Sequence, residues 1–462
     1  MARHNAYCEK MKRNWLPSLK STIFLMLCWM GSTGYAAGAE HRFSFMEAVR
    51  TALLNNHEVR AIQSAALAGN EAVGIARSYL QPRITFEERY LRTVNPGYAF
   101  MTKLNQERIE QQDFNPATLN NPDAINDFQT SFSVEQPLFT RKGLIGLEMS
   151  KAESAAKTEE SLRKKEEVVY QVAQAATSIQ TMKSFLDAAR KGVDEAREYV
   201  RITEVRYRAG LGQYSDTLRA ATSLSESEQR QVSAEKNLNV AKRTLGLLLG
   251  MEESVDILGA LPDVTLRNLS DYTQAALSRH DVKSGEIREE NARQSIKLAE
   301  AGYFPYVGVG GTYQLNDPNR PLGTEANNWQ VAAFLRWDLF DGTRREFERA
   351  KAKHEAAGAQ EQLSALKKAI SFRVYEAYLT IGEARKNMEL AQSAIKTAEE
   401  GKRLVRVRYE NGLYPLLELL NAQSSLDQAR AGSVAREGTY RLAVMRLSYE
   451  SGTIMKDLNI DP

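Results

Sequence analysis

The stretches "VRYRAGLGQYSDTLRAA" (205–221) and "VRYENGLYPLLELLNAQ" (407–423) are nearly the same phrase, written twice in one chain. Each follows a long charged segment, and proline is absent between positions 137 and 262 and between positions 321 and 415. Proline breaks helices, and glycine readily supplies the left-handed residue that ends them. Ala209-Gly210 in the first phrase and Asn411-Gly412 in the second therefore predict helix stops. Because apolar periodicity resumes after each stop, we predict two helical hairpins with tips near 210 and 412.

The segments that lead into the two phrases carry matching heptad patterns. Large residues recur every seven positions and small residues, mostly alanine, follow three positions later. In the first segment the large series is Val172, Ile179, Leu186, Val193, Val200 and Tyr207. In the second it is Val374, Ile381, Met388, Ile395, Lys402 and Tyr409, at a constant offset from the first. Small residues allow close helix packing, and a helix from about 140 to 208 would be roughly 100 Å long. Such a length suits a spanning tube or a stalk.

Between the helical segments the apolar period falls to two. Alternation around 84–90, 128–134, 307–313 and 329–337 predicts four strands of about ten residues, grouped as two hairpins. The pattern fits the wall of a transmembrane β-barrel, and it fits a half-buried soluble sheet equally well. Four strands cannot close a barrel, and open sheet edges are not tolerated in lipid. If the strands span a membrane, several chains must pool them.

The first 39 residues have the features of a secretory signal peptide. A basic segment is followed by the apolar "STIFLMLCWMG" and by a small-residue stretch, and we expect cleavage after Ala39. The apolar core is too short for a membrane anchor. Both cysteines, Cys8 and Cys28, lie in this segment, so the exported chain has no disulfide and no cysteine metal site. Removing it takes away five Lys and Arg residues and one acidic residue, which leaves a near-neutral protein without a nucleic-acid patch.

The repeats define the expected domain layout. Residues 40–261 form the first repeat, with a helix, strands within 83–137 and a helical hairpin over 140–250. Residues 262–462 form the second, with a helix, strands within 306–339 and a hairpin over 341–452. The first repeat holds about 21 extra residues between the strands, in the Asn-, Gln- and Pro-rich segment "GYAFMTKLNQERIEQQDFNPATLNNPDAIN" (97–126), which we expect to be loop.

The duplicated layout, "RYENGLYPLLELLNAQSSLDQAR" (408–430) and "QPLF" (136–139) together resemble the TolC-like outer-membrane factors. These are the exit ducts of tripartite efflux pumps and type I secretion systems. The resemblance covers nearly the whole exported chain. One departure is that His57 and His280 stand where the family often has proline.

The resemblance implies a mainly α fold with a membrane β-barrel portion. Three chains would pool twelve strands into a barrel in the outer membrane of a Gram-negative bacterium and twelve coiled-coil helices into a tunnel through the periplasm. Material around 251–275 and the C-terminal stretch would form a belt around the tunnel. The implied partners are a periplasmic adaptor, an inner-membrane pump and outer-membrane lipid. The implied role is a passive channel, gated at its periplasmic end, with no cofactor. The sequence carries no nucleophile, phosphate-loop or metal motif of an enzyme.

Family positions carried over by the resemblance give candidate functional residues at the hairpin ends. The pore constriction corresponds to Glu418 and Asn421, and the links between neighbouring hairpins to Asp216, Tyr409 and Tyr414. The expected contacts with an adaptor are the hairpin tips Gly210, Leu211, Gly412 and Leu413. Asn421 replaces an aspartate and Tyr414 an arginine, which weakens the second ring and one ionic link.

Each of these roles has a structural alternative. Glu418 also fits the solvated face of a helix, and Tyr409 also fits a core aromatic at a helix end. For the whole protein, the alternative is a periplasmic coiled-coil scaffold or surface filament whose strands are soluble.

Overall fold

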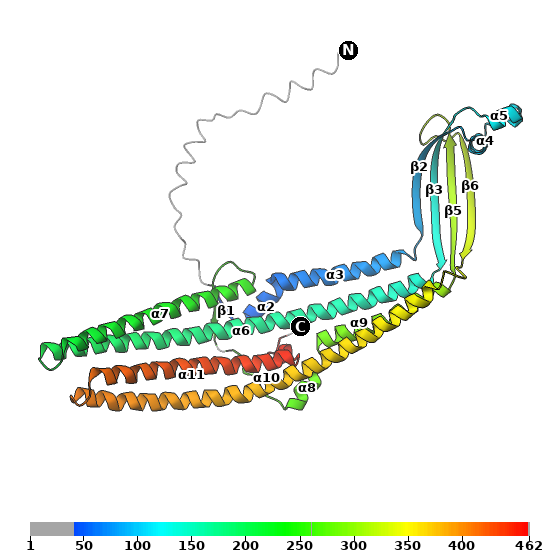
Figure 1. The fold of residues 1–462 in the computed structure, drawn as a ribbon. Coiled ribbons are helices and arrows are strands. Elements are labelled where there is room, and N and C mark those ends of the chain that lie inside the picture. Colours follow the sequence, from blue (N-terminus) through cyan, green and yellow to red (C-terminus); the bar gives the residue numbers. More distant parts are fainter. Residues whose placement is uncertain (1–40, 260, 461–462) are drawn as a thin grey trace, which may run out of the picture.

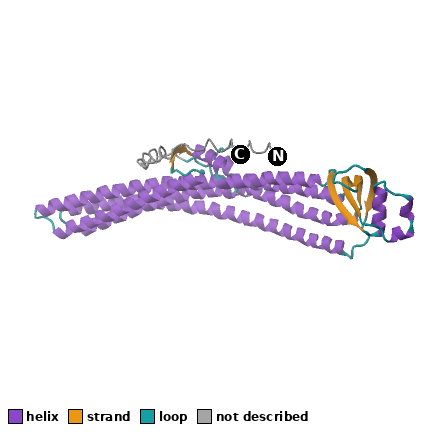
Figure 2. Cartoon of the chain, turned by 90° about the horizontal axis from the view of Figure 1, so that it is seen from above, coloured by secondary structure: helices purple, strands orange, loops and turns teal. Residues whose placement is uncertain are grey.

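Two long helical hairpins form the body of the protein (Figure 1). In the computed structural model, residues 41–259 and 261–460 are described, so the predicted signal peptide and its cleavage site lie outside the described residues. The first hairpin is α6 (Arg141–Arg208) and α7 (Tyr214–Leu248), and the second is α10 (Arg344–Glu410) and α11 (Leu416–Glu450). Helix α6 has 68 residues and α10 has 67. At 1.5 Å per residue each is about 100 Å long. Figure 2 shows the two hairpins from above, extending away from the strands.

The repeated phrases end the long helices as predicted. Gly210 and Gly412 have φ values of +70° and +72°, the left-handed conformation that favours glycine. The amide of Leu211 donates to the carbonyl of Arg206 at 2.8 Å, and Leu413 donates to Arg408 at 2.8 Å. These bonds satisfy carbonyls that the helix end would otherwise leave without a partner.

The two heptad seams are buried to different extents. The first series is buried along much of its length, and Val172, Ile179 and Val193 are at most 1% exposed. In the second series Val374 and Ile381 are buried, whereas Met388 and Ile395 are only half-buried. One chain therefore covers the first seam more completely than the second.

Four strands form one antiparallel sheet at one end of the helical body. They are β2 (Arg83–Thr93), β3 (Ile125–Phe139), β5 (Tyr306–Asp317) and β6 (Ala326–Arg336). Their order in the sheet is β2-β3-β5-β6, so the two β-hairpins, β2-β3 and β5-β6, meet along β3 and β5. The four-strand prediction is confirmed.

Shorter helices pack beside the hairpins. Helix α3 (His57–Ser78) lies along α6, and α9 (His280–Glu300) lies between α6 and α10. Helix α2 (Phe45–Asn55) precedes α3, and the one-turn 3-10 helix η2 (Ala301–Tyr303) joins α9 to β5. Among the described residues no helix combines the length and the apolar character that a membrane span requires.

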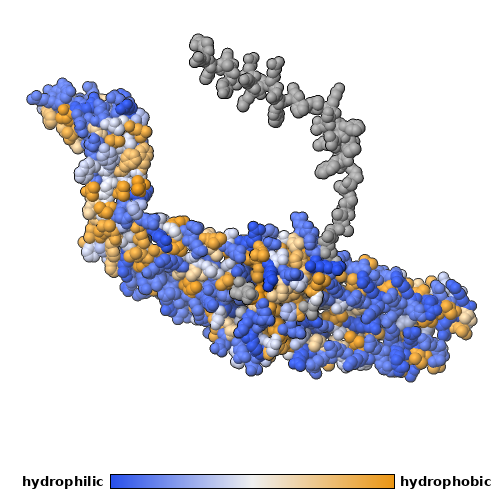
Figure 3. All heavy atoms as spheres, turned by 180° about the vertical axis from the view of Figure 1, so that it is seen from behind, coloured by the Kyte–Doolittle hydropathy of each residue, from blue (hydrophilic) through white to orange (hydrophobic). Residues whose placement is uncertain are grey.

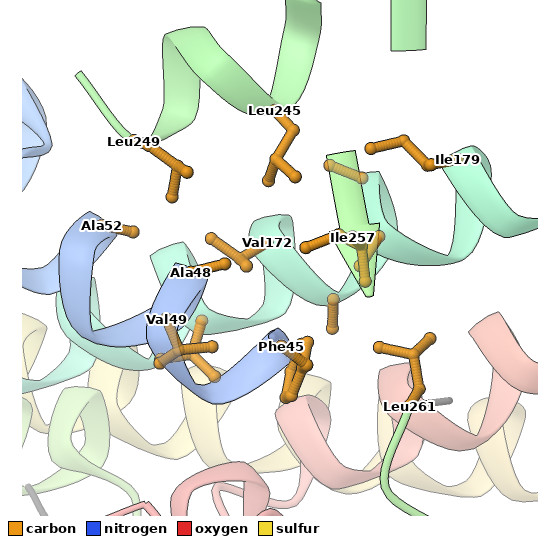
Figure 4. Packing of buried hydrophobic residues seen from close by; sticks show 14 of the residues in the cluster. Phe45, Ala48, Val49, Ala52, Val172, Ile179, Leu245, Leu249, Ile257 and Leu261 are labelled. Carbon is orange, nitrogen blue, oxygen red and sulfur yellow. The ribbon is translucent and has the colours of Figure 1, made fainter. Parts of the chain in front are cut away.

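A belt of short elements crosses the middle of the hairpins. It contains α8 (Leu269–Ala276), α12 (Ile454–Asp457) and a two-stranded parallel sheet of β1 (His41–Ser44) and β4 (Val255–Leu258). Figure 4 shows Phe45, Val172, Leu245 and Ile257 converging on one core from four different elements. The sequence reasoning predicted a belt here but not the β1–β4 pair.

The segment that was expected to be loop contains helices. These are α4 (Pro96–Asn105), the 3-10 helix η1 (Gln111–Phe114) and α5 (Pro116–Asn120). Asn95 caps α4 and Asn115 caps α5, and each cap is followed by proline at the first helical position. This Asn-Pro pair favours a helix start rather than a loop, because the proline ring fixes φ where no amide donor is needed.

Candidate functional site

The sheet has two chemically distinct faces. In register across the four strands, one face carries a row of aromatic rings: Phe86, Phe132, Tyr313 and Trp329. All of these rings are exposed, from 43% for Tyr313 to 73% for Trp329. The neighbouring row on the opposite face is Thr85, Ser133, Thr312 and Gln330. An apolar face exposed on this scale fits lipid, and a polar face fits a water-filled lumen. Figure 3 shows hydrophobic residues gathered on the strands, while the helical body is mostly hydrophilic.

The sheet has two unpaired edges within the described chain, β2 on one side and β6 on the other. Unpaired backbone amides and carbonyls are not tolerated in lipid, since no water is present to satisfy them. A sheet of four strands that faces lipid would therefore have to be one part of a larger closed wall.

The helices form a wall with open edges that continue those of the sheet. Towards the strands the packing order is α3, α6, α9 and α10, and towards the tips it is α7, α6, α11 and α10. Helix α10 thus bounds one edge throughout, and α3 and α7 bound the other. Large apolar side chains remain exposed on these bounding helices, including Leu67, Ile75, Val232, Val240, Phe372 and Leu390.

At the tips, the structure brings Tyr409 against the first hairpin of its own chain. Tyr409 is 5% exposed and belongs to a small core with Tyr199, Ala220 and Leu416. The guanidinium of Arg206 lies 5.1 Å from its ring centroid. Burial raises the pKa of Tyr409; Arg206 opposes that shift and Asp216 adds to it. The contact described here lies within one chain, and a link between chains stays a prediction.

The other predicted tip residues are more exposed. Arg408 on the same hairpin donates to the hydroxyl of Tyr414 at 2.5 Å. Glu418 and Asn421 are exposed, three positions apart in the first turns of α11. At the tips themselves Leu211 is 70% and Leu413 is 71% exposed.

Sequence reasoning missed a polar cluster that joins the two hairpins. Glu195 on α6 lies 3.0 Å from Lys402 on α10 and 3.4 Å from Arg430 on α11. Gln423 bonds to Glu195 and Asp427 and accepts from the Tyr199 hydroxyl at 3.1 Å. The one signal in the sequence was Lys402, a charged residue at a large position of the second heptad series.

The pKa values of the two carboxylates in the cluster are shifted in opposite directions. Burial alone would raise the pKa of Glu195, but the hydrogen bond and charge of Lys402, with Gln423 and Arg430, outweigh it and the pKa is lowered. Burial raises the pKa of Asp427, and Gln423 and Arg230 offset that shift only in part. Glu195 thus pairs with two cations of the second hairpin, and Asp427 lies 3.8 Å from Arg230 on the first.

His57 and His280 each stand at the first position of a helix. His57 begins α3, where Asn56 caps the helix, and His280 begins α9, where its Nδ1 lies 2.6 Å from Glu159 on α6. In the part of the chain that the structure describes, no group of three or more His, Cys, Asp or Glu side chains is arranged to hold a metal ion.

The fold is thus a sheet with one exposed apolar face and two unpaired edges, mounted on a helical wall whose bounding helices are also open. The family model of the outer membrane efflux proteins matches residues 48–251 and 272–453. The chain belongs to this TolC-like family, which places it in the outer membrane of Gram-negative bacteria.

Individual relatives are distant. Protein CyaE of Bordetella pertussis is 27% identical over 282 residues, which cover 59% of this chain and 60% of that protein. Nodulation protein T of Rhizobium leguminosarum bv. trifolii is 23% identical over 289 residues, which cover 58% of this chain and 59% of that protein. Outer membrane protein TolC of Vibrio cholerae is 19% identical over 92% of this chain and 93% of its own.

Solved structures share the fold at low identity. A crystal structure of CusC matches 88% of this chain and 92% of its own, with a TM-score of 0.73 and 16% identity. The Campylobacter jejuni CmeC outer membrane channel matches 90% of both chains, with a TM-score of 0.73 and 14% identity.

Proposed function

We propose that three copies of this chain close into one passive channel that crosses the outer membrane and continues as a tunnel in the periplasm. The observation that carries the proposal is the two-faced sheet with unpaired edges on β2 and β6. Four strands fall below the smallest known barrels of about eight, and three copies supply an even number within the known range. Family membership supports a trimer rather than another multiple.

The edges suggest how the copies meet. Strand β6 of one copy would pair with β2 of the next, and α10 would pack against the neighbouring α3 and α7. These helices carry exposed apolar side chains of the kind that interfaces bury. The half-buried second heptad series would be covered in the same step.

The role that we propose is the exit duct of a tripartite efflux or type I secretion assembly. The exposed hairpin tips, with Leu211 and Leu413, would meet a periplasmic adaptor that connects the duct to an inner-membrane pump. Three copies of Glu418, with Asn421 beside them, would ring the periplasmic mouth with negative charge and favour cations. Asp216, Tyr409 and Tyr414 would hold neighbouring hairpins together there.

Cysteine crosslinking tests the assembly, because residues 40–462 contain no cysteine of their own. Closing a tilted barrel staggers the register between copies, so Glu87→Cys on β2 is combined in turn with cysteine at the polar-face β6 positions Asn328, Gln330, Ala332 and Phe334; one of these chains should give disulfide-linked dimers and trimers on a non-reducing gel. The matched control is Ser133→Cys with Thr312→Cys, whose hydroxyl oxygens lie 3.1 Å apart within one sheet. That pair should form a disulfide inside single chains.

Light scattering of the detergent-purified protein should give the mass of three chains. A monodisperse monomer in buffer without detergent would reject the channel and favour the soluble scaffold.

A further inference from the structure

The extra helical segment of the first repeat lies on the polar face of the sheet. We call Asn95–Asn121 the insert; it holds α4, η1 and α5. Figure 1 shows it at the end of the sheet away from the helical body. Helix α4 contacts both β3 and β6, which are not neighbours in the sheet. A helix that contacts both strands lies across a face of the sheet rather than beyond its edge.

Hydrogen bonds identify which face the insert covers. The amide of Gln106 donates to the Asp127 carboxylate at 2.9 Å and to the Asn126 carbonyl at 2.8 Å. Asp127 also accepts from Gln129 at 2.6 Å and from Asn316 at 2.8 Å. Asp127, Gln129 and Ser133 are separated by even numbers of residues along β3, so their side chains lie on the same side of the sheet. That side is the polar face.

The insert packs tightly against the polar face of the sheet, as the burial of the polar side chains between them shows. Gln106, Asp127 and Asn316 are at most 1% exposed, although they are polar and lie at the outer end of the sheet. A buried carboxylate without an opposite charge needs several donors, and the insert supplies one of the three side-chain donors that Asp127 has. Lys103 and Asp113 tie the insert together through a 2.6 Å ion pair. The insert is therefore a folded unit fixed to the sheet by Gln106.

We propose that the insert is a collar that narrows the outer exit of the channel and sets the size of what passes. The proposal rests on the trimeric duct proposed above, in which the polar face lines the lumen. Twelve strands spaced about 4.8 Å apart and tilted about 40° make a barrel of about 24 Å backbone diameter. One helix with its side chains is about 10 Å across. Three inserts on the lumen side therefore occupy much of the exit.

The first experiment removes the collar. In one variant Gly97–Asn121 is replaced by a short Gly-Ser linker, and single-channel conductance is measured in planar bilayers with polyethylene glycols of graded size on the outer side. We expect at least a twofold rise in conductance and entry of larger polymers. Wild-type conductance and wild-type polymer cut-off in this variant would overturn the collar and leave the duct intact. A wild-type protein that does not conduct would reject the duct itself.

Smaller changes cover the case in which that deletion does not fold. Gln106→Leu removes the anchoring amide and should raise conductance and current noise. The control Gln112→Leu changes an exposed residue whose side-chain amide bonds within the insert, to Glu110 at 2.5 Å, and should leave both unchanged.

A labelling experiment tests position directly. Tyr98 is 65% exposed on α4, and Tyr98→Cys treated on the outer side with a polyethylene glycol maleimide should reduce conductance in up to three steps. Trp329→Cys, on the lipid face, should neither label nor lose conductance, because the polymer reagent does not enter the hydrocarbon. Complete labelling of position 98, checked by mass spectrometry, with unchanged current would overturn the proposal.

Discussion

Lys402→Met should loosen the contact between the two hairpins of one chain. Lys402 is 13% exposed and pairs with Glu195 at 3.0 Å, and Glu195 itself is 28% exposed. Removing one partner of a fully buried pair costs about 3–5 kcal/mol. Arg430 remains 3.4 Å from Glu195 and the site is only partly buried, so we expect a loss of about 2 kcal/mol. That loss shifts the ratio of separated to joined hairpins roughly 30-fold.

Spin labels at the tips measure this shift. Leu211→Cys and Leu413→Cys place labels on exposed residues of the two hairpins, and mixing with excess unlabelled chain isolates distances within one copy. The starting protein should give one narrow distance, and Lys402→Met should add a longer one. Lys386→Met is the matched control, since this lysine is 69% exposed and pairs with Glu389 on its own helix. An unchanged distance distribution in Lys402→Met would refute the role of the Glu195–Lys402 pair in holding the hairpins together.

Three further changes probe other parts of the wall. Asp427→Asn should raise the melting temperature at pH 7, because burial raises the folded-state pKa of Asp427 above 3.8; the gain should vanish as the pH falls through that pKa and below 3.8. A lower melting temperature at pH 7 would contradict it. Glu418→Gln should weaken block of single-channel current by divalent cations, while Glu355→Gln, on the shaft of α10, should not; equal block in both would reject the ring. Trp329→Arg should lower the temperature at which the assembly dissociates on a gel, at a cost of about 1–4 kcal/mol per chain, whereas Gln330→Arg on the lumen face should be tolerated. Equal loss in both would argue against a lipid-facing aromatic row.

Local sequence determined the elements and their faces. The glycines at 210 and 412 end the long helices because only the left-handed backbone completes the terminal hydrogen bonds there. Alternation along β3 separates Phe132 from Ser133, and this period of two is enough to predict which side chains share a face. Amino-acid composition did not predict the insert correctly. Its Asn and Pro content predicted loop, but Asn95 and Asn115 cap helices and a proline follows each at the first helical position.

Only the tertiary structure decided which distant elements become partners. Glu195 and Lys402 come from different hairpins, β1 and β4 from opposite ends of the first repeat, and Gln106 reaches Asp127 across the face of the sheet. Periodicity encodes the direction in which a side chain points along its own element. It does not encode which residue of another element lies opposite, because that depends on how the whole chain packs. The hairpin ends and the faces of the sheet could therefore be predicted, whereas the polar cluster and the cover over the lumen face became visible only in three dimensions.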